Sequence, residues 1–223
     1  KYKLGNHTLV CGDATNKEHI DYLIKDNVID LVFTDPPYGN GKAGHYGRGE
    51  LGHRTIKNDK DFSTFQKYLQ INNFKEIIFF LQWRTFDICL QTLKKNDYKL
   101  KSIGVWDKKN ASLGQGLAEQ WEAIFFVGNL DFTKFGGNVF NISREYKKRE
   151  NSPHPHQKPI FLLADILNFL QNYKNILDTF GGSGSTLIAC EQLERNCFIM
   201  ELDIEYCQVI IDRWEKFTGQ KAE

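Results

Sequence analysis

The chain has 223 residues, of which 41% are hydrophobic and 26% charged, and its formal net charge is +1. This length suits one α/β domain with a buried core and is too short for two ordinary enzyme domains. The composition excludes a largely disordered chain, and the near-neutral charge disfavours a protein that coats nucleic acid indiscriminately. Its apolar runs are much shorter than the roughly 18 residues that cross a bilayer. The polar start lacks a secretory signal, so we expect no membrane association and a cytoplasmic location.

The cysteines give no sign of a disulfide framework or a zinc site. There are five, an odd number, and no two of them form a C-x-x-C pair. We interpret them as reduced and mostly buried: Cys11, Cys89, Cys190, Cys197 and Cys207.

Short apolar runs rich in β-branched and aromatic residues alternate with stretches of helical period. This alternation predicts a mainly parallel sheet with crossover helices. In chain order we expect helix 17–25, strand 29–34, helix 62–73, strand 76–81, helix 85–96, strands 100–106 and 123–127, helix 159–172, strand 175–179, helix 185–195, strand 197–202 and helix 204–218.

Two regions interrupt this alternation. Residues 39–52 contain six of the chain's 18 glycines, which predicts a mobile loop. Residues 128–155 carry a basic cluster between Arg144 and Arg149. We expect this second region to be an irregular or small β insert with a basic rim.

The tetrapeptide Asp35-Pro36-Pro37-Tyr38 directly follows the expected strand 29–34. Two prolines remove two backbone donors and hold the chain extended, so a carboxylate and an aromatic ring are presented rigidly. Ligands bind at the carboxyl ends of strands in open α/β sheets. The alternative is a strand-ending turn with a capping aspartate, but the strand before the motif and the tyrosine within it favour a functional site.

A second motif, from Asp178 to Thr186, joins strand 175–179 to helix 185–195. Its glycines allow a ligand to approach the backbone, and the helix start offers free N–H groups. The spacing fits neither a Walker loop nor the dinucleotide pattern. The next strand carries Glu201 near its end, where an acidic side chain can bind a ribose. We interpret the motif as a cofactor loop, the alternative being a tight turn with a solvated glutamate.

A third motif runs from His154 to Pro159 and leads into helix 159–172. Its two histidines have no Cys, Asp or Glu cluster nearby in the sequence, so we expect no metal. Lys158 is interpreted as a charge at the mouth of the cofactor site, the alternative being an ordinary solvated lysine.

Taken together, the motifs resemble those of the S-adenosylmethionine-dependent amino-methyltransferases of DNA. The similarity comprises D-P-P-Y after a strand, H-P-x-Q-K-P entering a helix, D-x-F-x-G-S-G-S-T and an acidic strand end. The order, with the catalytic tetrapeptide first, is similar to the beta class. The resemblance covers Gly12 to Tyr206. Thr179 stands where the family usually has proline, and His156 where it often has threonine.

The resemblance implies one Rossmann-like methyltransferase domain over residues 1–223. It would have a mainly parallel sheet, helices on both faces and a circularly permuted motif order. The catalytic half would cover about residues 1–127, a short target-recognition insert about 128–153, and the cofactor-binding half about 154–223.

The implied reaction transfers the methyl group of S-adenosylmethionine to N6 of a flipped-out adenine in DNA. Asp35 and the Pro36 carbonyl would accept the two amino hydrogens, and Tyr38 would stack on the base. Catalytic residues are therefore Asp35, Pro36, Pro37 and Tyr38. Aspartate at the first motif position is typical of adenine enzymes and serine of cytosine enzymes, so cytosine N4 stays open as the alternative. Methylation at ring C5 is set aside, because no Pro-Cys occurs.

The resemblance also implies the binding residues. Asp13 would lie against the cofactor's adenine, with a turn aspartate capping the helix at Lys17 as the alternative. The residues expected to bind the cofactor are Asp13, Ala14, Asp35, Lys158, Asp178, Phe180, Gly182, Ser183, Gly184, Ser185, Thr186, Glu201 and Leu202. Those expected to contact DNA are Arg48, Arg54, Arg144, Lys147, Lys148 and Arg149. The Trp106-Asp107-Lys108 segment and Glu122 would border the base pocket, or be a core aromatic and solvated charges.

The expected partner is double-stranded DNA. Because the insert is short, a homodimer or a DNA-recognition or restriction partner would extend the contact. Two other readings stay open: methylation of RNA or a small molecule on the same fold, and a catalytically silent partner subunit. The intact Asp35, Tyr38 and glycine motif count against silence.

Overall fold

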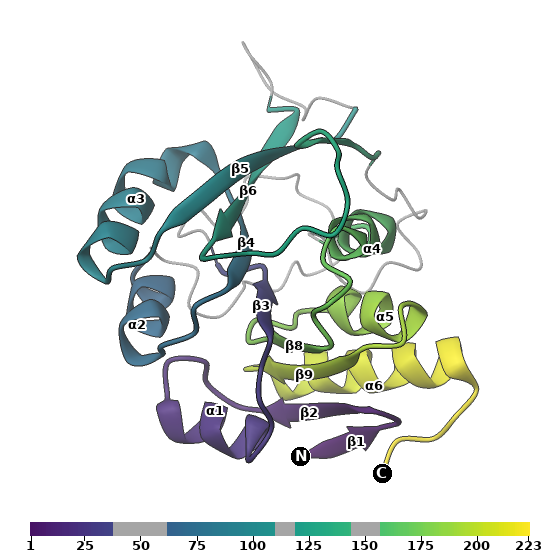
Figure 1. The fold of residues 1–223 in the computed structure, drawn as a ribbon. Coiled ribbons are helices and arrows are strands. Elements are labelled where there is room, and N and C mark those ends of the chain that lie inside the picture. The colour runs from purple at the N-terminus through teal and green to yellow at the C-terminus, as the bar shows by residue number, and fades with distance from the viewer. Residues whose placement is uncertain (38–61, 110–118, 144–156) are drawn as a thin grey trace, which may run out of the picture.

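The computed structural model describes residues 1–37, 62–109, 119–143 and 157–223 (Figure 1). In these residues, nine strands form one sheet in the order β1-β2-β9-β8-β3-β4-β6-β5-β7. The strands are β1 (Tyr2–Leu4), β2 (His7–Cys11), β3 (Leu31–Thr34), β4 (Ile77–Leu81), β5 (Leu100–Asp107), β6 (Trp121–Val127), β7 (Val139–Asn141), β8 (Asn175–Asp178) and β9 (Asn196–Glu201). The helices are α1 (Lys17–Ile24), α2 (Ser63–Ile71), the 3-10 turn η1 (Trp83–Thr85), α3 (Phe86–Lys95), α4 (Ile160–Asn168), α5 (Ser185–Gln192) and α6 (Ile204–Thr218).

The central strands β2, β9, β8, β3 and β4 all run parallel. Beyond β4 the sheet continues with β6, which is antiparallel to both β4 and β5, and β7 pairs in parallel with β5. On the other side, β1 pairs antiparallel with β2. The predicted mainly parallel sheet is confirmed for the strands that carry the sequence motifs.

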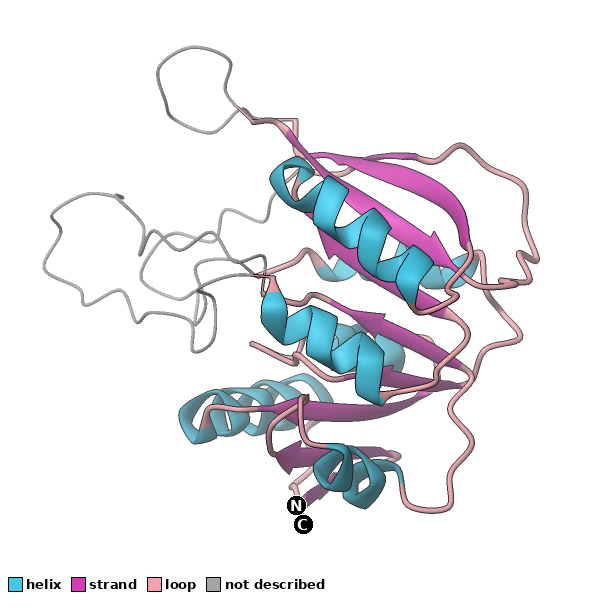
Figure 2. Ribbon diagram, turned by 90° about the vertical axis from the view of Figure 1, so that its left-hand side faces the viewer, coloured by secondary structure: helices cyan, strands magenta, loops and turns pink. Residues whose placement is uncertain are grey.

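Helices cover both faces of the sheet, as predicted. Helices α1 to α3 lie on one side and α4 to α6 on the other (Figure 1), and Figure 2 shows the face that α1 to α3 cover. Successive strand residues therefore point into two different cores: Phe33 packs with α4 to α6, and Val32 with α1 to α3. This two-sided burial explains why β3 and β4 read as continuous apolar runs without alternation.

The direction in which successive strands are added to the sheet reverses at its middle. From β3 it passes through α2 to β4 on one side, whereas from β8 it passes through α5 to β9 on the other. Strands β3 and β8 are neighbours, so the point between them is a topological switch point, where α/β folds bind ligands. The D-P-P-Y motif follows β3 and the glycine motif follows β8.

Every helix and strand expected from the sequence is present; helix 204–218 has the expected bounds, and the others have one or both ends shifted. The largest shift is in the helix predicted over 159–172, which ends at Asn168. The Phe169 carbonyl accepts a hydrogen bond from the Thr133 N–H (2.7 Å), and Leu170 stays buried through a tighter turn to Leu167.

Strands β1 and β2 are not among the expected elements, and β7 is a short strand within the region expected to be an irregular or small β insert. In β2 the polar residues His7 and Thr8 hide the apolar pattern, yet both are buried. The His7 ring satisfies its polar atoms by bonding Glu191 (2.8 Å) and by accepting from the Cys197 N–H (3.0 Å). Strand β2 lies beside β9 and β1 lies beside β2, so the start of the chain joins the side of the sheet predicted to bind the cofactor.

The predicted insert after β6 has two parts in space. Residues 128–138 lie at the edge opposite Asp35, where Asp131 accepts from Asn172 and its N–H donates to the Tyr173 hydroxyl. Strand β7 then brings the chain back to the edge of Asp35, with Asn141 beside Asp107. The basic cluster and the predicted loop 39–52 lie outside the described residues. Within those residues, none of the helices is long and apolar enough to cross a membrane.

Candidate active site

Five strand ends meet at one edge of the sheet. Gly12 follows β2, Asp35 follows β3, Gln82 follows β4, Gly181 comes after β8, and Glu201 ends β9. Because these five strands are parallel neighbours, their carboxyl ends form one continuous edge. The sequence-predicted cofactor and catalytic motifs are therefore brought together, on the two sides of the switch point.

The glycine turn after β8 passes very close to β9. The Gly181 N–H donates to the Met200 carbonyl (2.8 Å), and a Cβ at Gly181 would lie 2.7 Å from the Ile199 side chain. Gly182 has φ +51°, which favours glycine, and a Cβ there would meet no atom within 4 Å. The outer side of the turn at Gly182 is thus open for a ligand to approach.

Glu201 holds this turn in place. One carboxylate oxygen accepts from the Gly182 N–H and the other from the Asp203 N–H, both at 2.8 Å. Its carbonyl accepts from the Gly12 N–H, which ties the end of β2 to the same point. Burial raises the pKa of Glu201. A carboxylate has about four lone-pair sites, so these two bonds leave room for a ribose hydroxyl.

Arg213 also holds the glycine turn, a role that the sequence did not indicate. Arg213 of α6 donates from Nη1 to the Ser183 carbonyl (2.9 Å), to the Ser183 hydroxyl (3.2 Å) and to the Ser185 hydroxyl (3.2 Å). Both serines are buried. Their side chains therefore face Arg213, and what this segment can offer a ligand is the backbone N–H groups at the start of α5. No sequence signal marks an arginine in the middle of a later helix for this role.

Asp178 joins the two strands of the switch point. It is buried, and its Oδ1 accepts from the Thr34 hydroxyl (2.6 Å) and from the Phe180 N–H (3.1 Å). Burial raises its pKa to about 6. The side chain thus acts inside the protein, linking β3 to the start of the glycine turn.

Asp13 forms a local turn after β2. Its Oδ1 accepts from the Thr15 N–H (2.8 Å), and its own N–H donates to Nδ1 of His19 (3.0 Å). The alternative that Asp13 caps the following helix is wrong, because Asn16 is the N-cap and accepts from the Glu18 N–H. Of its predicted companions, Ala14 is buried and Leu202 is exposed.

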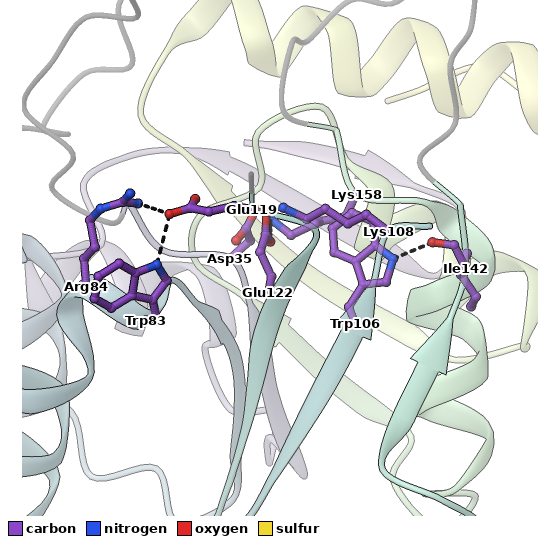
Figure 3. A network of polar contacts seen from close by, with 9 residues as sticks. All are labelled: Asp35, Trp83, Arg84, Trp106, Lys108, Glu119, Glu122, Ile142 and Lys158. Carbon is purple, nitrogen blue, oxygen red and sulfur yellow. Dashed lines mark hydrogen bonds and ion pairs between the residues drawn. The ribbon is translucent and has the colours of Figure 1, made fainter. Parts of the chain in front are cut away.

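Asp35 stands at one end of a chain of four alternating charges (Figure 3). Lys158 Nζ donates to Asp35 Oδ2 (2.5 Å) and lies 3.3 Å from Glu122 Oε2. Lys108 Nζ lies 2.5 Å from Glu122 Oε1. The side chains of Lys108, Glu122 and Lys158 are 5%, 11% and 7% exposed, against 29% for Asp35. Lys158 is therefore not a solvated lysine. Its ammonium forms an ion pair with Asp35, the predicted catalytic carboxylate.

The four charges stabilise one another. Burial by itself would lower the pKa of Lys158, but Asp35 and Glu122 outweigh it and the pKa is raised. Burial would likewise raise the pKa of Glu122, but Lys158 and Lys108 lower it to about 2. Lys158 and Glu122 are therefore both charged near neutral pH, and the cluster pairs two lysines with two carboxylates.

The neighbouring strand ends carry further polar pairs (Figure 3). Glu119 accepts from Nε1 of Trp83 (3.0 Å) and forms an ion pair with Arg84. Trp106 is buried in the core and donates to the Ile142 carbonyl (2.6 Å). The interpretation of Trp106 as a core aromatic fits this structure, whereas Lys108 and Glu122 are buried rather than solvated.

Several predicted site residues lie outside the described part of the chain. They are Tyr38, Arg48, Arg54, Arg144, Lys147, Lys148 and Arg149. Pro36 is buried and Pro37 half-buried beside Asp35. Across the described ranges, His, Cys, Asp and Glu form no group of three that could hold a metal ion.

Comparisons with known proteins agree with this geometry. Residues 129–212 match a family model described as DNA methylase, of the N6/N4 type. The chain is 27% identical to Type II methyltransferase M2.MboI of Moraxella bovis, over 89% of this chain and 86% of that protein. It is 24% identical to Type II methyltransferase M.HpaI of Haemophilus parainfluenzae, over 88% and 71%. The chain is thus similar to DNA methylases over most of its length.

Solved structures of DNA methylases share its fold. The complex of M1.HpyAVI with SAM superimposes with a TM-score of 0.68 at 24% identity, covering 93% of this chain and 99% of that one. The cytosine-N4-specific PvuII DNA methyltransferase gives 0.73 at 17% identity, covering 97% and 92%. The predicted resemblance to amino-methyltransferases of DNA and the predicted Rossmann-like fold are confirmed. Membership of the beta class and the choice of adenine stay predictions.

Proposed function

We propose that this DNA methylase relative transfers the methyl group of S-adenosylmethionine to an exocyclic amino nitrogen in double-stranded DNA, with adenine N6 as the acceptor. The observation that carries this proposal is the juxtaposition at the switch point. Asp35 follows β3, and the open glycine turn follows the adjacent strand β8. A bound SAM in the structural neighbour M1.HpyAVI supports the cofactor.

The residues at the glycine turn fit this cofactor. The space outside Gly182 is open, and α5 begins three residues later at Ser185, where the first N–H groups of a helix have no partner within the helix. Glu201 lies beside the turn and retains acceptor capacity for a ribose hydroxyl. When bound, S-adenosylmethionine supplies an electrophilic methyl group. Lys158 stays a predicted cofactor contact, although its ammonium lies on Asp35 and Glu122.

Asp35 would prepare the acceptor nitrogen. The lone pair of an exocyclic amino group is delocalised into the ring, which makes the nitrogen a weak nucleophile. Hydrogen bonds from its two protons to the Asp35 carboxylate and the Pro36 carbonyl would draw the lone pair back onto nitrogen and orient it. Methyl transfer leaves the nitrogen positively charged, so it must lose one proton, and the Asp35 carboxylate is the base beside it.

Access to the amino group requires the base to leave the duplex. Flipping costs a few kcal/mol, which stacking on Tyr38 would partly offset. The basic residues expected to contact phosphates would hold the duplex without reading its sequence. A homodimer or a DNA-recognition or restriction partner would enlarge this contact.

The acceptor base is tested directly by product analysis. The protein is incubated with labelled S-adenosylmethionine and unmodified genomic DNA, and the digested nucleosides are separated. We expect label in N6-methyladenine. Label in N4-methylcytosine would replace adenine by cytosine, as in the PvuII enzyme that shares the fold. Transfer to RNA but not DNA would change the substrate class. Cofactor binding without any transfer would identify a silent subunit.

A further inference from the structure

We infer that Glu122 is a positioning residue that fixes the ammonium of Lys158 on Asp35, with Lys108 holding Glu122 in turn. The inference rests on the proposed function for what Asp35 does to the base. Glu122 lies in β6, and no contact between it and the reacting atoms is required. Its effect would reach them through one lysine.

The cluster joins four separate parts of the fold. Asp35 follows β3, Glu122 belongs to β6, Lys108 follows β5, and Lys158 lies just before α4. The ring of Phe80 in β4 lies under the Lys158 ammonium, 4.9 Å from it. An ammonium in such a place is stable only if it is paired, since burying an isolated charge is very costly. Among the described residues, Asp35, Glu122 and the Phe80 ring contact the Lys158 ammonium, and Lys108 lies on the other oxygen of Glu122.

The two carboxylates that hold Lys158 differ in exposure. Asp35 is 29% exposed and must engage the incoming base, whereas Glu122 is 11% exposed and lies deeper. Glu122 can therefore keep the ammonium in place while Asp35 adjusts to the substrate. Such advance placement of charge is how active sites avoid reorganisation during the reaction.

Mutation of Glu122 tests the inference because it changes the charge balance around Lys158. With Glu122 ionised, two lysines face two carboxylates. Glu122→Gln keeps the size and the hydrogen-bonding shape but leaves two ammonium groups facing one carboxylate. The Lys158 ammonium would then lose its proton at a lower pH and its hold on Asp35 would weaken. Adding Lys108→Met removes the surplus positive charge and restores the balance.

The first experiment measures single-turnover methylation of duplex DNA from pH 6.5 to 10. We expect Glu122→Gln to lower the rate about ten- to a hundredfold, the scale of a small misplacement of a reacting group. We also expect it to bring into this range an alkaline fall in rate that lies at higher pH in the parent. Cofactor affinity should change much less than the rate. The double variant with Lys108→Met should regain part of the rate. Glu119→Gln, the same change at the neighbouring Trp83–Arg84 pair, is the matched control and should behave like the parent.

A parent-like rate and pH profile in Glu122→Gln would overturn the inference. Equal rates in the single and double variants would also overturn it, because Glu122 would then act on something other than the charge of Lys158. Thermal unfolding of each variant checks the fold. If Glu122→Gln does not fold, the charge-balanced double variant carries the pH comparison with the parent.

The second experiment does not depend on methylation. The titration of Lys158 is followed by NMR of ¹³C-labelled lysine, with its signal assigned by its loss in Lys158→Met. We expect the Lys158 signal to titrate at lower pH in Glu122→Gln than in the parent. If this shift occurs in a protein that methylates no DNA, the proposed function fails and the coupling stands. Methylation without the shift overturns the inference and leaves the function intact.

Discussion

The two sides of the switch point are built in different ways. On the proposed cofactor side, the main chain forms the glycine turn, and side chains hold this turn by hydrogen-bonding its backbone groups. Glu201 accepts from the Gly182 N–H, and Arg213 donates to the Ser183 carbonyl. On the proposed acceptor side, side chains hold one another, and Lys158 forms ion pairs with both Asp35 and Glu122. The contrast suits the two proposed tasks, since one side would fit the shape of a cofactor and the other would orient a single reacting carboxylate.

The largest expected effect is at Asp35. Asp35→Ala should lower the methyl-transfer rate on the order of a hundredfold or more, because a positioned acceptor would be lost as the nitrogen rehybridises. Cofactor affinity should change much less, since Glu201 and the glycine turn remain. Single-turnover methylation and cofactor titration of the same variant measure both quantities. A parent-like rate would remove Asp35 from the reaction, and an equal collapse of cofactor binding would mean that the two sides are not separable.

Opposite pH responses should distinguish the two sides. The pKa of Glu122 is lowered from 4.5 to about 2, so its contribution to stability is present above pH 4.5 and is lost as the pH falls towards 2. The pKa of Asp178 is raised from 3.8 to about 6, so its contribution is present below pH 3.8 and is lost as the pH rises through 6. Each change corresponds to roughly 3 kcal/mol in the free energy of unfolding.

Chemical denaturation between pH 2 and 7 measures these two slopes. Glu122→Gln should remove the loss of stability between pH 4.5 and 2, and Asp178→Asn should remove the loss between pH 3.8 and 6. Each variant serves as the control for the other. Slopes of the same sign for both residues would contradict the assignment of their environments.

The two kinds of construction also differ in how far the sequence reveals them. The glycine turn could be predicted. Close packing against a neighbouring strand and a left-handed backbone both require glycine, so the turn appears in the sequence as a run of glycines between a strand and a helix. The hold of Lys158 on Asp35 could not be predicted, because the two residues are 123 positions apart and meet only once β3 and the start of α4 are in place. Lys158 was singled out for its motif but was expected to face the cofactor.

Two other features were not predicted for the same reason, namely that they depend on contacts between distant parts of the chain. Strand β2 was not predicted, because His7 is polar and its burial depends on Glu191 in a helix far along the chain. Arg213 carries no motif, and its role appears only when α6 lies beside the glycine turn. Local patterns in the sequence thus located the strands and turns, whereas the partners that fix the site depend on tertiary contacts.

Two adjacent glycines allow a finer test of the cofactor side. Gly181→Ala would place a Cβ 2.7 Å from Ile199 and 3.1 Å from the Met200 carbonyl, and should destabilise the protein by about 1 to 3 kcal/mol. Gly182→Ala meets no atom within 4 Å but keeps φ +51°, and should cost about 1 to 2 kcal/mol in stability. Its methyl group faces the ligand side, so it should weaken cofactor binding beyond that loss.

Thermal unfolding and calorimetric titration with S-adenosylmethionine, applied to both variants, give the two quantities. If Gly182→Ala folds and binds the cofactor as the parent does, the cofactor does not approach the turn on that side.

The smallest expected effect is at Arg213, which contacts the turn from behind. Arg213→Met removes three hydrogen bonds from one guanidinium nitrogen to Ser183 and Ser185. Because the arginine is partly exposed, water can replace some of these bonds, and we expect a loss of about 1 kcal/mol in stability. The turn would become less rigid without losing any group that faces the ligand, so cofactor affinity should fall several-fold while the rate at saturating cofactor stays near the parent value.

Lys216→Met, at an exposed position further along α6, is the control and should leave both the stability and the cofactor affinity unchanged. A fall in the saturated rate comparable to that of Asp35→Ala would mean that the backbone of the turn also sets the geometry of the acceptor side, and the division between a shaped main chain and a charge-held carboxylate would have to be given up.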